Sequence, residues 1–455
     1  MDAQLLFLCW LLKFRSHFIV KEFKTFINIT ESKRYVMKKI FLTLLFMNAL
    51  CIQKSIAGGF KIGLQGQKQL GMGHTGVGFA QDAATIYFNP AGMSFVGSQL
   101  NASFFALMPS TSFHESNTNT LTHAVNQVFT PFSFYGNVKL SKKMNFGLGI
   151  YTPFGSGVLY PNEWTGRYIL RSIELQVIYF QPSISYRISD AVSIGGGFVY
   201  ASGHVDLRKD IPIQGAAFAE TAHAKLYGKG NGVGYNIGTY IKTDKINFGL
   251  TYHSKVNMKV DNGDAIFENI PTALASNFPK NNTFNAELPL PSELAFGTSF
   301  KISKRTRFAA DINYTFWKSF DSLGFDYQMN TSTLSDAKSP RLYKNAFSIK
   351  GGLQYNASNA IQLRAGAFYD QTPVADGYVA PELPDNNKVG LTCGATFKIL
   401  ERFHIDCSIL YESVAKRTQK NLETGLEGTF QTKAFAPGVG VTYLLQKRTY
   451  KRKRY

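Results

Sequence analysis

Apolar and polar residues alternate over most of the chain. From Gly97 onward, segments of about ten residues carry an apolar side chain at every second position, as in Leu100–Ala106, Phe132–Leu140 and Val192–Tyr200. This period of two is the pattern of a β-strand with one face in an apolar environment. We count fourteen such segments, each long enough to cross an outer membrane, for which about 9 to 11 tilted residues suffice. The pattern therefore predicts fourteen β-strands.

The links between these segments alternate in length. Short links such as Ser141–Lys143 and Leu400–Arg402 alternate along the chain with long ones such as 204–226 and 261–291. Short turns at one end and long loops at the other are typical of outer-membrane β-barrels. A soluble β-sandwich, the main alternative, would not keep this alternation over seven hairpins. We expect an all-β fold, an antiparallel transmembrane β-barrel of fourteen strands over 97–445.

The N-terminal part of the chain predicts export. A basic start and the apolar stretch Ile40–Ile52 precede a small-x-small cleavage signal that ends at Ala57, so 37–57 is predicted to be a secretory signal peptide. The apolar stretch is shorter than the roughly 18 to 20 residues of a membrane-spanning helix. A signal peptide is expected to begin the translated chain, so residues 1–36 are not expected ahead of it. We interpret them as a translation start assigned too early, with an extra membrane anchor as the alternative.

Charge and cysteine content narrow the classes of partner. The chain has a net charge of +19, but from Gly58 on the charge is +13, and six basic residues lie in the last nine. We interpret 446–455 as a basic periplasmic tail, so the barrel itself is only mildly basic and nucleic acid is not an expected partner. Cys393 and Cys407, the cysteines that remain after processing, share the parity of the apolar positions. We expect two free thiols that face lipid.

Residues 58–96 interrupt the alternation. A barrel of this size must have its interior filled or become a water channel, so we expect this Gly-rich stretch to fold inside the barrel as a hatch. Gly71–Gly76 matches G-x-G-x-x-G, but no apolar strand precedes it, no βαβ unit follows, and Val96 stands where a ribose-binding acid would be needed. Dinucleotide binding is excluded on this ground, and neither a cofactor nor a metal site is predicted.

Several motifs resemble those of the FadL-type outer-membrane transporters. They are Gly58-Gly59-Phe60, Leu70–Gly76, Asp82-Ala83-Ala84, Asn89-Pro90-Ala91, Tyr151–Gly155, Trp164–Arg167 and Leu288–Pro291. The resemblance covers the chain from Gly58 on, and implies a monomeric barrel with an N-terminal plug that admits long-chain fatty acids or related hydrophobic compounds. A family member normally ends on an aromatic residue that closes the last strand. Here Tyr443 would play that part, ahead of the basic extension.

The long outer loops 204–226 and 261–291 are rich in apolar residues, which usually mark a binding surface when they are exposed. We expect an outer groove in which a hydrophobic molecule first adsorbs. The alternative is that these side chains only pack a lid over the mouth of the barrel. The predicted groove residues are Ile211, Ile213, Phe218, Ile266, Phe267, Ile270, Leu274 and Phe278.

Below the groove we expect a lumen pocket with a basic residue that meets a carboxylate. Its moving part would be the mature N-terminus around Phe60, which is short and flanked by glycines. Inward-facing Asp311 and Asp406 leave an alternative, in which they neutralise the basic residues as structural pairs. The predicted pocket residues are Phe60, Arg167, Lys350 and Arg364.

The third strand contains a proline. Pro153 has no N–H to donate to the ladder, and Gly155 weakens the strand further. We predict a kink that opens a gap in the wall next to the hatch residues Asn89, Pro90 and Ala91, through which the hydrophobic molecule leaves sideways into the bilayer when the hatch moves. The alternative is that Pro153 lies above the membrane and begins a loop.

Four other functions are alternatives to the uptake of fatty acids. An enzyme is disfavoured because no G-x-S-x-G occurs and no histidine keeps a fixed relation to a serine or an acid. A general porin is disfavoured by the hatch and by the apolar loops. A surface adhesin or receptor, and a channel of the same fold for aromatic hydrocarbons, stay open as alternatives.

Overall fold

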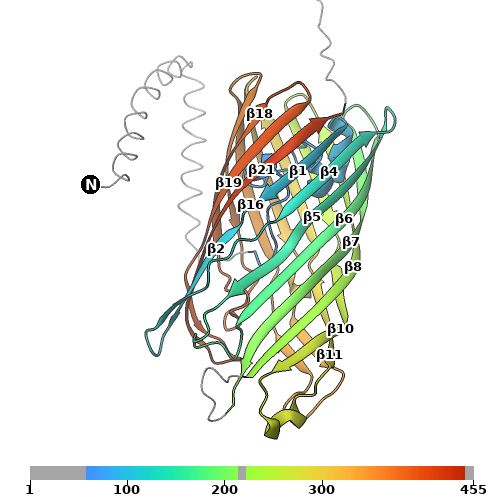
Figure 1. The fold of residues 1–455 in the computed structure, drawn as a ribbon. Helices are drawn as coiled ribbons and strands as arrows, with labels where there is room; N and C mark the ends of the chain where they lie inside the picture. Colours follow the sequence, from blue (N-terminus) through green and yellow to red (C-terminus); the bar gives the residue numbers. More distant parts are fainter. Residues whose placement is uncertain (1–57, 214–221, 446–455) are drawn as a thin grey trace, which may run out of the picture. The chain divides into compact units, whose positions relative to one another are not determined.

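The computed structural model describes residues 58–213 and 222–445, and these form a closed β-barrel (Figure 1). The predictions of a misassigned start, a signal peptide and a basic tail fall on 1–57 and 446–455, outside the described residues. Among the described residues, no helix is long and apolar enough to cross a membrane.

Each strand pairs with its neighbours in antiparallel register. The strands are β1 Gln99–Phe105, β2 Met108–Glu115, β3 Leu121–His123, β4 Phe132–Lys139, β5 Met144–Leu159, β6 Ser172–Arg187, β7 Val192–Ile211, β8 Ala222–Lys242, β9 Ile246–His253, β10 Val256–Glu268, β11 Asn282–Leu290, β12 Glu293–Lys301, β13 Thr306–Thr315, β14 Ser322–Tyr327, β15 Ala337–Pro340, β16 Ala346–Asn356, β17 Ile361–Asp370, β18 Lys388–Lys398, β19 Phe403–Val414, β20 Arg417–Lys420 and β21 Glu427–Leu444.

Bends divide seven of the barrel strands into two segments each. These pairs are β1 with β2, β3 with β4, β9 with β10, β11 with β12, β13 with β14, β15 with β16, and β19 with β20, as their shared partners indicate. Counted in this way, fourteen strands build the barrel. Because β1 pairs with β4 on one side and with β21 on the other, the sheet closes on itself. The predicted fourteen-stranded antiparallel barrel is confirmed.

The alternation along each strand sorts side chains between the lumen and the outside. On β8, Tyr235 and Ile237 are half exposed on the outer face, whereas Asn236 between them is fully buried in the lumen. Likewise Leu391 of β18 faces outward and Thr392 faces inward. An apolar exterior and a polar interior are what a barrel in lipid requires. Cys393 and Cys407 are both free, as predicted.

Strands β7 and β8, with 20 and 21 residues, are about twice as long as a crossing needs. They remain paired as far as Ile211 and Ala222, so most of the predicted loop 204–226 is strand, and that prediction is wrong. Similarly, β10 and β11 occupy most of 261–291, around the short helix η3 Thr272–Asn277. The ladder continues there because apolar residues still face inward while polar ones face outward.

The hatch fills one end of the lumen, as predicted. It contains the short helices α3 Gln67–Leu70, α4 Thr85–Phe88 and η1 Pro90–Phe95, and almost all of its residues are buried. The carboxylate of Asp311 accepts hydrogen bonds from the backbone N–H groups of Gly76 and Val77, at 2.6 and 2.9 Å. Asp311 therefore holds the hatch backbone against β13.

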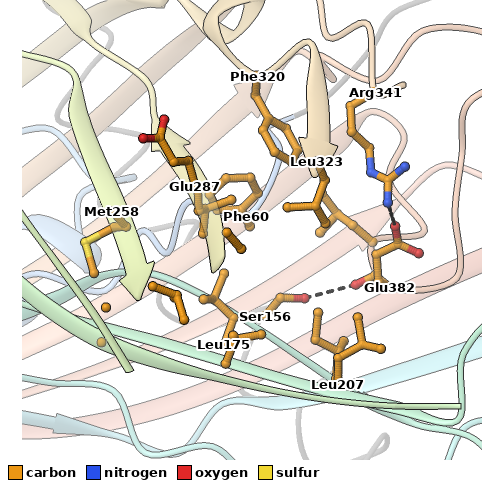
Figure 2. Close-up of a pocket in the computed structure, with 18 of the residues that line it drawn as sticks. Phe60, Ser156, Leu175, Leu207, Met258, Glu287, Phe320, Leu323, Arg341 and Glu382 are labelled. Carbon is orange, nitrogen blue, oxygen red and sulfur yellow. Dashed lines mark hydrogen bonds and ion pairs between the residues drawn. The ribbon is translucent and has the colours of Figure 1, made fainter. Parts of the chain in front are cut away.

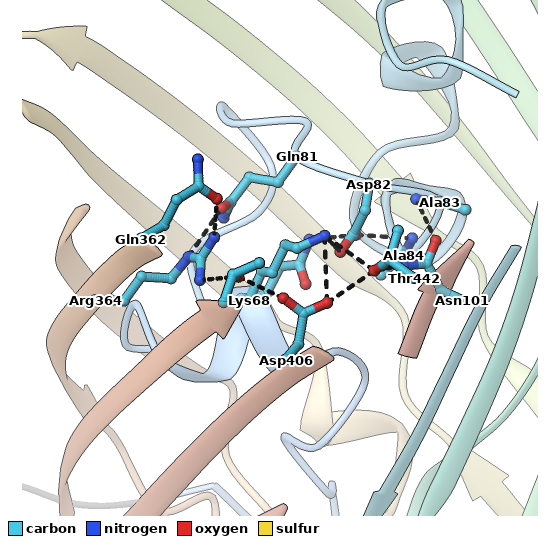
Figure 3. A network of polar contacts seen from close by, with 12 residues as sticks. Lys68, Gln81, Asp82, Ala83, Ala84, Asn101, Gln362, Arg364, Asp406 and Thr442 are labelled. Carbon is cyan, nitrogen blue, oxygen red and sulfur yellow. Dashed lines mark hydrogen bonds and ion pairs between the residues drawn. The ribbon is translucent and has the colours of Figure 1, made fainter. Parts of the chain in front are cut away.

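A polar network fastens α3 to the barrel wall (Figure 3). The ammonium of Lys68 lies 3.1 Å from a carboxylate oxygen of Asp82 and 3.4 Å from one of Asp406, and it donates to Thr442 of β21. Asn101 of β1 accepts from the N–H of Ala83 and donates to Thr442. The hatch is thus bonded to both strands at which the barrel closes.

Candidate functional site

An apolar cavity of about 100 Å³ lies in the part of the barrel built by the long strands (Figure 2). Its wall comes from lumen-facing residues of β6, β7, β10 and β11, with Phe320 and Leu323 completing it. Leu175, Leu207 and Met258 are among the side chains that point into it (Figure 2). Because these strands extend beyond the length needed to cross lipid, the cavity lies toward the long-loop end of the barrel.

Polar groups at the edge of this cavity are already paired. The guanidinium of Arg341 contacts the carboxylate of Glu382 at 2.7 Å, and Glu423 lies 3.7 Å from its other nitrogen. The hydroxyl of Ser156 donates to the backbone carbonyl of Glu382 at 3.0 Å (Figure 2). Because these polar groups are paired with one another, the interior of the cavity is apolar and suits the uncharged part of a ligand.

The loop 371–387 folds over the cavity. Tyr378, Ala380 and Leu383 line it, and the hydroxyl of Tyr160, beyond the end of β5, donates to the carbonyl of Pro381 at 3.2 Å. A long link is expected here from the sequence, but it is not among the predicted site residues. The available signal was the set of apolar residues between β17 and β18, of which Val379 is almost fully buried.

The tip of the hatch, residues 59–62, forms the inner wall of the cavity through Phe60. The ring of Phe60 is 6% exposed and packs against Trp317, Phe320 and Phe154, with centroid distances of 4.9, 5.5 and 5.9 Å. Gly59 has φ +63°, and a Cβ there would overlap the ring of Trp317. Only glycine combines this backbone with so close an approach.

A second, polar cavity of about 70 Å³ is lined by Trp317 and by three basic and three acidic residues, Lys61, Lys350, Lys388, Glu293, Asp370 and Glu412. Lys61 pairs with Glu293 of β12. Lys350 differs from Lys61, because within 58–213 and 222–445 no hydrogen bond or ion pair holds its ammonium group; Glu293, Asp370 and Asp311 act on it from farther away. Phe60 and Trp317 therefore lie between an apolar cavity and a polar one that contains an unpaired cation.

The backbone ladder of the barrel wall is interrupted between β4 and β5, where the hydroxyl of Thr152 takes its place by accepting from the N–H of Phe132 at 3.2 Å. Their ladder stops at Ser133 and Tyr151, and the β5–β6 register shifts between Tyr151 and Phe154, which marks a bulge at Pro153. If the β4–β5 register continued, Pro131 would face Pro153, and neither proline has an N–H to donate. Backbone pairing between the chain ahead of β4 and the end of β5 resumes at Val125, whose N–H donates to the carbonyl of Leu159 at 2.8 Å.

The hatch tip pairs with this bulge. The N–H of Ile62 donates to the carbonyl of Pro153 at 2.8 Å, and the N–H of Gly155 donates to the carbonyl of Phe60 at 3.0 Å. The tip therefore takes up backbone groups of β5 that the missing ladder leaves open. Phe60 touches the apolar cavity and the interrupted wall at once.

The prediction that Asn89, Pro90 and Ala91 lie next to the gap is wrong. The amide of Asn89 donates to the carbonyl of Thr239 on β8 at 2.9 Å, and the hydroxyl of Ser193 on β7 donates to Ala91. Asn89 also caps η1 by accepting from the N–H of Ala91. These bonds hold the motif against β7 and β8, away from the bulge on β5.

The structure does not bring the four predicted lumen residues together. Phe60 lines the apolar cavity and Lys350 the polar one. Arg364 lies near the short-turn end, where it donates to Thr396 at 2.7 Å and to Gln354 at 3.1 Å. Arg167 belongs to the segment between β5 and β6, with its Nε 3.7 Å from Asp210. The two arginines are thus held in structural contacts.

The predicted groove residues lie at the outer rim and do not line the apolar cavity. Phe267 packs against Phe278, with ring centroids 5.3 Å apart, while Ile266 points to the outside of β10. Ile270 and Leu274 lie in or beside η3, and Ile211 and Ile213 lie at the end of β7. The prediction for Phe218 falls outside the described residues.

A pH dependence is expected at the hatch tip. The N–H of Gly59 donates to the carboxylate of Asp385 at 3.0 Å, in the loop above the barrel. Burial raises the pKa of Asp385 to about 7, although Lys388, Thr372 and the Gly59 N–H favour its charged form. Because this pKa lies above the ordinary value of 3.8, folding favours the protonated acid, and this contribution to stability is lost as pH rises from about 4 to about 7.

We therefore expect the amides of residues 59–62 to exchange hydrogen more readily at pH 8 than at pH 6, after correction for intrinsic rates. Hydrogen-exchange mass spectrometry of the native chain and of Asp385→Asn measures this. The variant should show the same protection at both pH values. Equal protection in the native chain would contradict the expectation.

Comparison with known proteins agrees with this geometry. Residues 48–445 match the family model described as outer membrane protein transport protein (OMPP1/FadL/TodX). The long-chain fatty acid transport protein of Salmonella typhi is 24% identical, over 81% of this chain and 92% of its own length. A solved FadL homologue of Pseudomonas aeruginosa superimposes with a TM-score of 0.75 at 19% identity, over 86% of this chain and all of its own.

The toluene transporter TodX of Pseudomonas putida has a TM-score of 0.65 at 17% identity, over 86% of this chain and 99% of its own. At these identities the solved structures establish the fold. The family match establishes that the barrel lies in the bacterial outer membrane. The chain belongs to the OMPP1/FadL/TodX family of outer membrane transport proteins, which are channels for hydrophobic compounds and not enzymes.

Proposed function

We propose that this barrel takes up long-chain fatty acids or similar hydrophobic molecules by passive diffusion. The molecule adsorbs at the outer rim around η3, enters the apolar cavity, and leaves sideways through the interrupted wall beside Pro153 when the hatch tip moves. One observation carries the proposal: Phe60 lines the apolar cavity, and its segment is also bonded to the bulge on β5. A displacement of this segment would therefore connect the cavity with the gap.

Passive passage requires that the cavity binds the molecule weakly. Complete burial of a sixteen-carbon tail at about 0.8 kcal/mol per methylene would give on the order of 12 kcal/mol, a site from which the ligand would hardly leave. Partial burial of such a tail in the cavity would keep the ligand weakly bound. Passive transport needs this balance, because no energy source drives release.

The unpaired Lys350 separates two classes of substrate. A fatty acid has a carboxylate that would meet this ammonium in the polar cavity once Phe60 has moved, whereas an aromatic hydrocarbon has no group for it. The relatives name both classes, since the Salmonella typhi protein is a fatty acid transporter and TodX a toluene transporter. We place the fatty acid first because the cation lies beyond the apolar cavity, as a head group beyond a tail would require.

The test compares uptake of radiolabelled oleate and of toluene in a strain that lacks its own transporter, with and without this gene. Lys350→Met is expected to lower oleate uptake about tenfold, as for a lost charge-assisted contact of roughly 1.4 kcal/mol, and to leave toluene uptake unchanged. Lys229→Met, on the outer face of β8, is the matched control and should change neither. If the gene raised the uptake of neither compound, the proposed function would be wrong.

A further inference from the structure

Basic side chains ring the end of the barrel that carries the short turns. Seven strands run toward this end, and in five of them the last lumen-facing residue is Lys or Arg, whereas no acid takes that position in the described strands. These five residues, here called the basic ring, are Lys139 of β4, Arg187 of β6, Lys242 of β8, Lys301 of β12 and Lys398 of β18. In outer-membrane barrels the short-turn end faces the periplasm.

The underside of the hatch forms an aromatic floor inside this ring. Phe79 and Phe95 are half-buried there, and the guanidinium of Arg307 lies 5.1 Å from the ring centroid of Phe79. Arg187 and Lys242 lie 5.1 and 5.3 Å from the centroid of Phe95. Two hollows of about 260 and 390 Å³ share Phe95 and Lys242. The second hollow is lined by Lys139, Arg187 and Lys242 together with Asp190 and Asp244, and Asp190 lies 3.3 Å from Arg187. The surface is therefore concave, aromatic in its centre, and cationic on balance at its rim.

The direction of the basic ring excludes lipid as its partner. At the same strand ends, the residues that face outward are Leu140, Ile188, Ile302 and Ile399, which are exposed aliphatic side chains suited to the bilayer. The ring residues alternate with these and face the lumen. They consequently meet the aqueous periplasm.

Two further occupants do not match the surface. The chain's own segment 446–455 is strongly basic in sequence, so the ring would repel it. A free phosphate ion would use the cations but leave the aromatic floor without a contact. An acidic polypeptide with apolar side chains matches both features, because complementary charge and a buried aromatic centre together are typical of protein interfaces.

We propose that the periplasmic face of the hatch is a docking site for an acidic segment of a soluble periplasmic protein. Carboxylates of the partner pair with Lys139, Arg187 and Lys242, and an apolar side chain rests on Phe95. Since Phe95 ends η1, the docked segment touches the hatch itself. The site is separate from the apolar cavity, so it does not depend on the proposed transport path.

The test uses the full mature chain in detergent and a fluorescein-labelled peptide of alternating acidic and phenylalanine residues, followed by fluorescence anisotropy. The triple variant Lys139→Ala, Arg187→Ala, Lys242→Ala is expected to bind the peptide about tenfold more weakly, for three contacts of roughly 0.5 kcal/mol each. The matched control removes the same charge at the same end, from turn residues outside the ring: Lys142→Ala, Lys304→Ala, Arg305→Ala. It should change affinity by less than roughly twofold.

Two more probes identify the occupant. A peptide with serine in place of phenylalanine should bind more weakly to the native chain, and Phe95→Ser should abolish the difference between the two peptides. Equal losses in the ring and control variants, or equal binding of both peptides, would show mere attraction between opposite net charges and overturn the proposal. Ring-dependent binding of phosphatidylglycerol vesicles or of inorganic phosphate, without binding of the peptide, would overturn it in favour of a lipid or ion site.

Discussion

Leu175→Asp is expected to lower the uptake of hydrophobic molecules about tenfold or more. Leu175 of β6 points into the apolar cavity (Figure 2), and a carboxylate there would either stay charged at a desolvation cost of several kcal/mol or draw in water. Since about 1.4 kcal/mol corresponds to a factor of ten, even partial hydration of the cavity removes most of the affinity for an apolar ligand. The initial rate of oleate or toluene uptake measures the effect.

The control adds the same charge to an outward-facing residue away from the interrupted wall. Asn231 of β8 is exposed and pairs across the ladders with Ser202 and Lys259, so Asn231→Asp does not place its charge in the cavity. Its uptake should equal that of the native chain, at equal amounts of folded barrel in the membrane. Equal losses in the two variants would show that the apolar cavity is not on the path.

The double variant Pro131→Val, Pro153→Val is expected to lower uptake about tenfold by closing the interrupted wall. It restores an N–H on each strand at the place where the β4–β5 ladder stops, so pairing can continue beyond Ser133 and Tyr151. Two regained backbone hydrogen bonds, at about 1 kcal/mol each, favour the closed wall over the bulge by more than a factor of ten. Uptake assays and the midpoint of thermal unfolding are the two measurements.

Pro182→Val is the matched control, because Pro182 also lies within a strand but pairs in regular register with Leu148, away from the gap. It should leave uptake unchanged. The double variant should unfold at a higher temperature than the native chain, since the new bonds are stabilising. A stabilised barrel that still transports at the native rate would exclude the wall beside Pro153 as the exit.

The sequence predicted the barrel because lipid imposes a simple rule on each strand. An apolar side chain at every second position, such as Phe198 and Tyr200 on β7, marks the outer face wherever the bilayer touches it. Beyond the bilayer the rule is reversed, as polar Asp206 and Arg208 face outward while Val205 and Leu207 face the cavity. Alternation alone therefore predicts a loop for the outer half of β7 and does not reveal the apolar cavity.

The candidate site depended on contacts that alternation does not encode. The proline in the third strand predicts an irregular wall. That Pro131 lies opposite it follows only from the β4–β5 register, which the structure provides. The position of Asn89 is set by a single side-chain bond to β8, and that of Arg364 by Thr396 and Gln354. Such pairings join residues far apart in the chain, and one sequence gives no period or spacing that would reveal them.

The fastening of α3 to β1 and β21 has a consequence for assembly. Lys68 lies near the start of the hatch, and Thr442, which accepts its hydrogen bond, lies near the end of the last barrel strand. Without Lys68, Asp406 would stay buried in the lumen without this cation, so we expect a barrel that lacks the hatch to close less stably between β1 and β21. The hatch would then serve the closure of the barrel as well as the filling of its lumen.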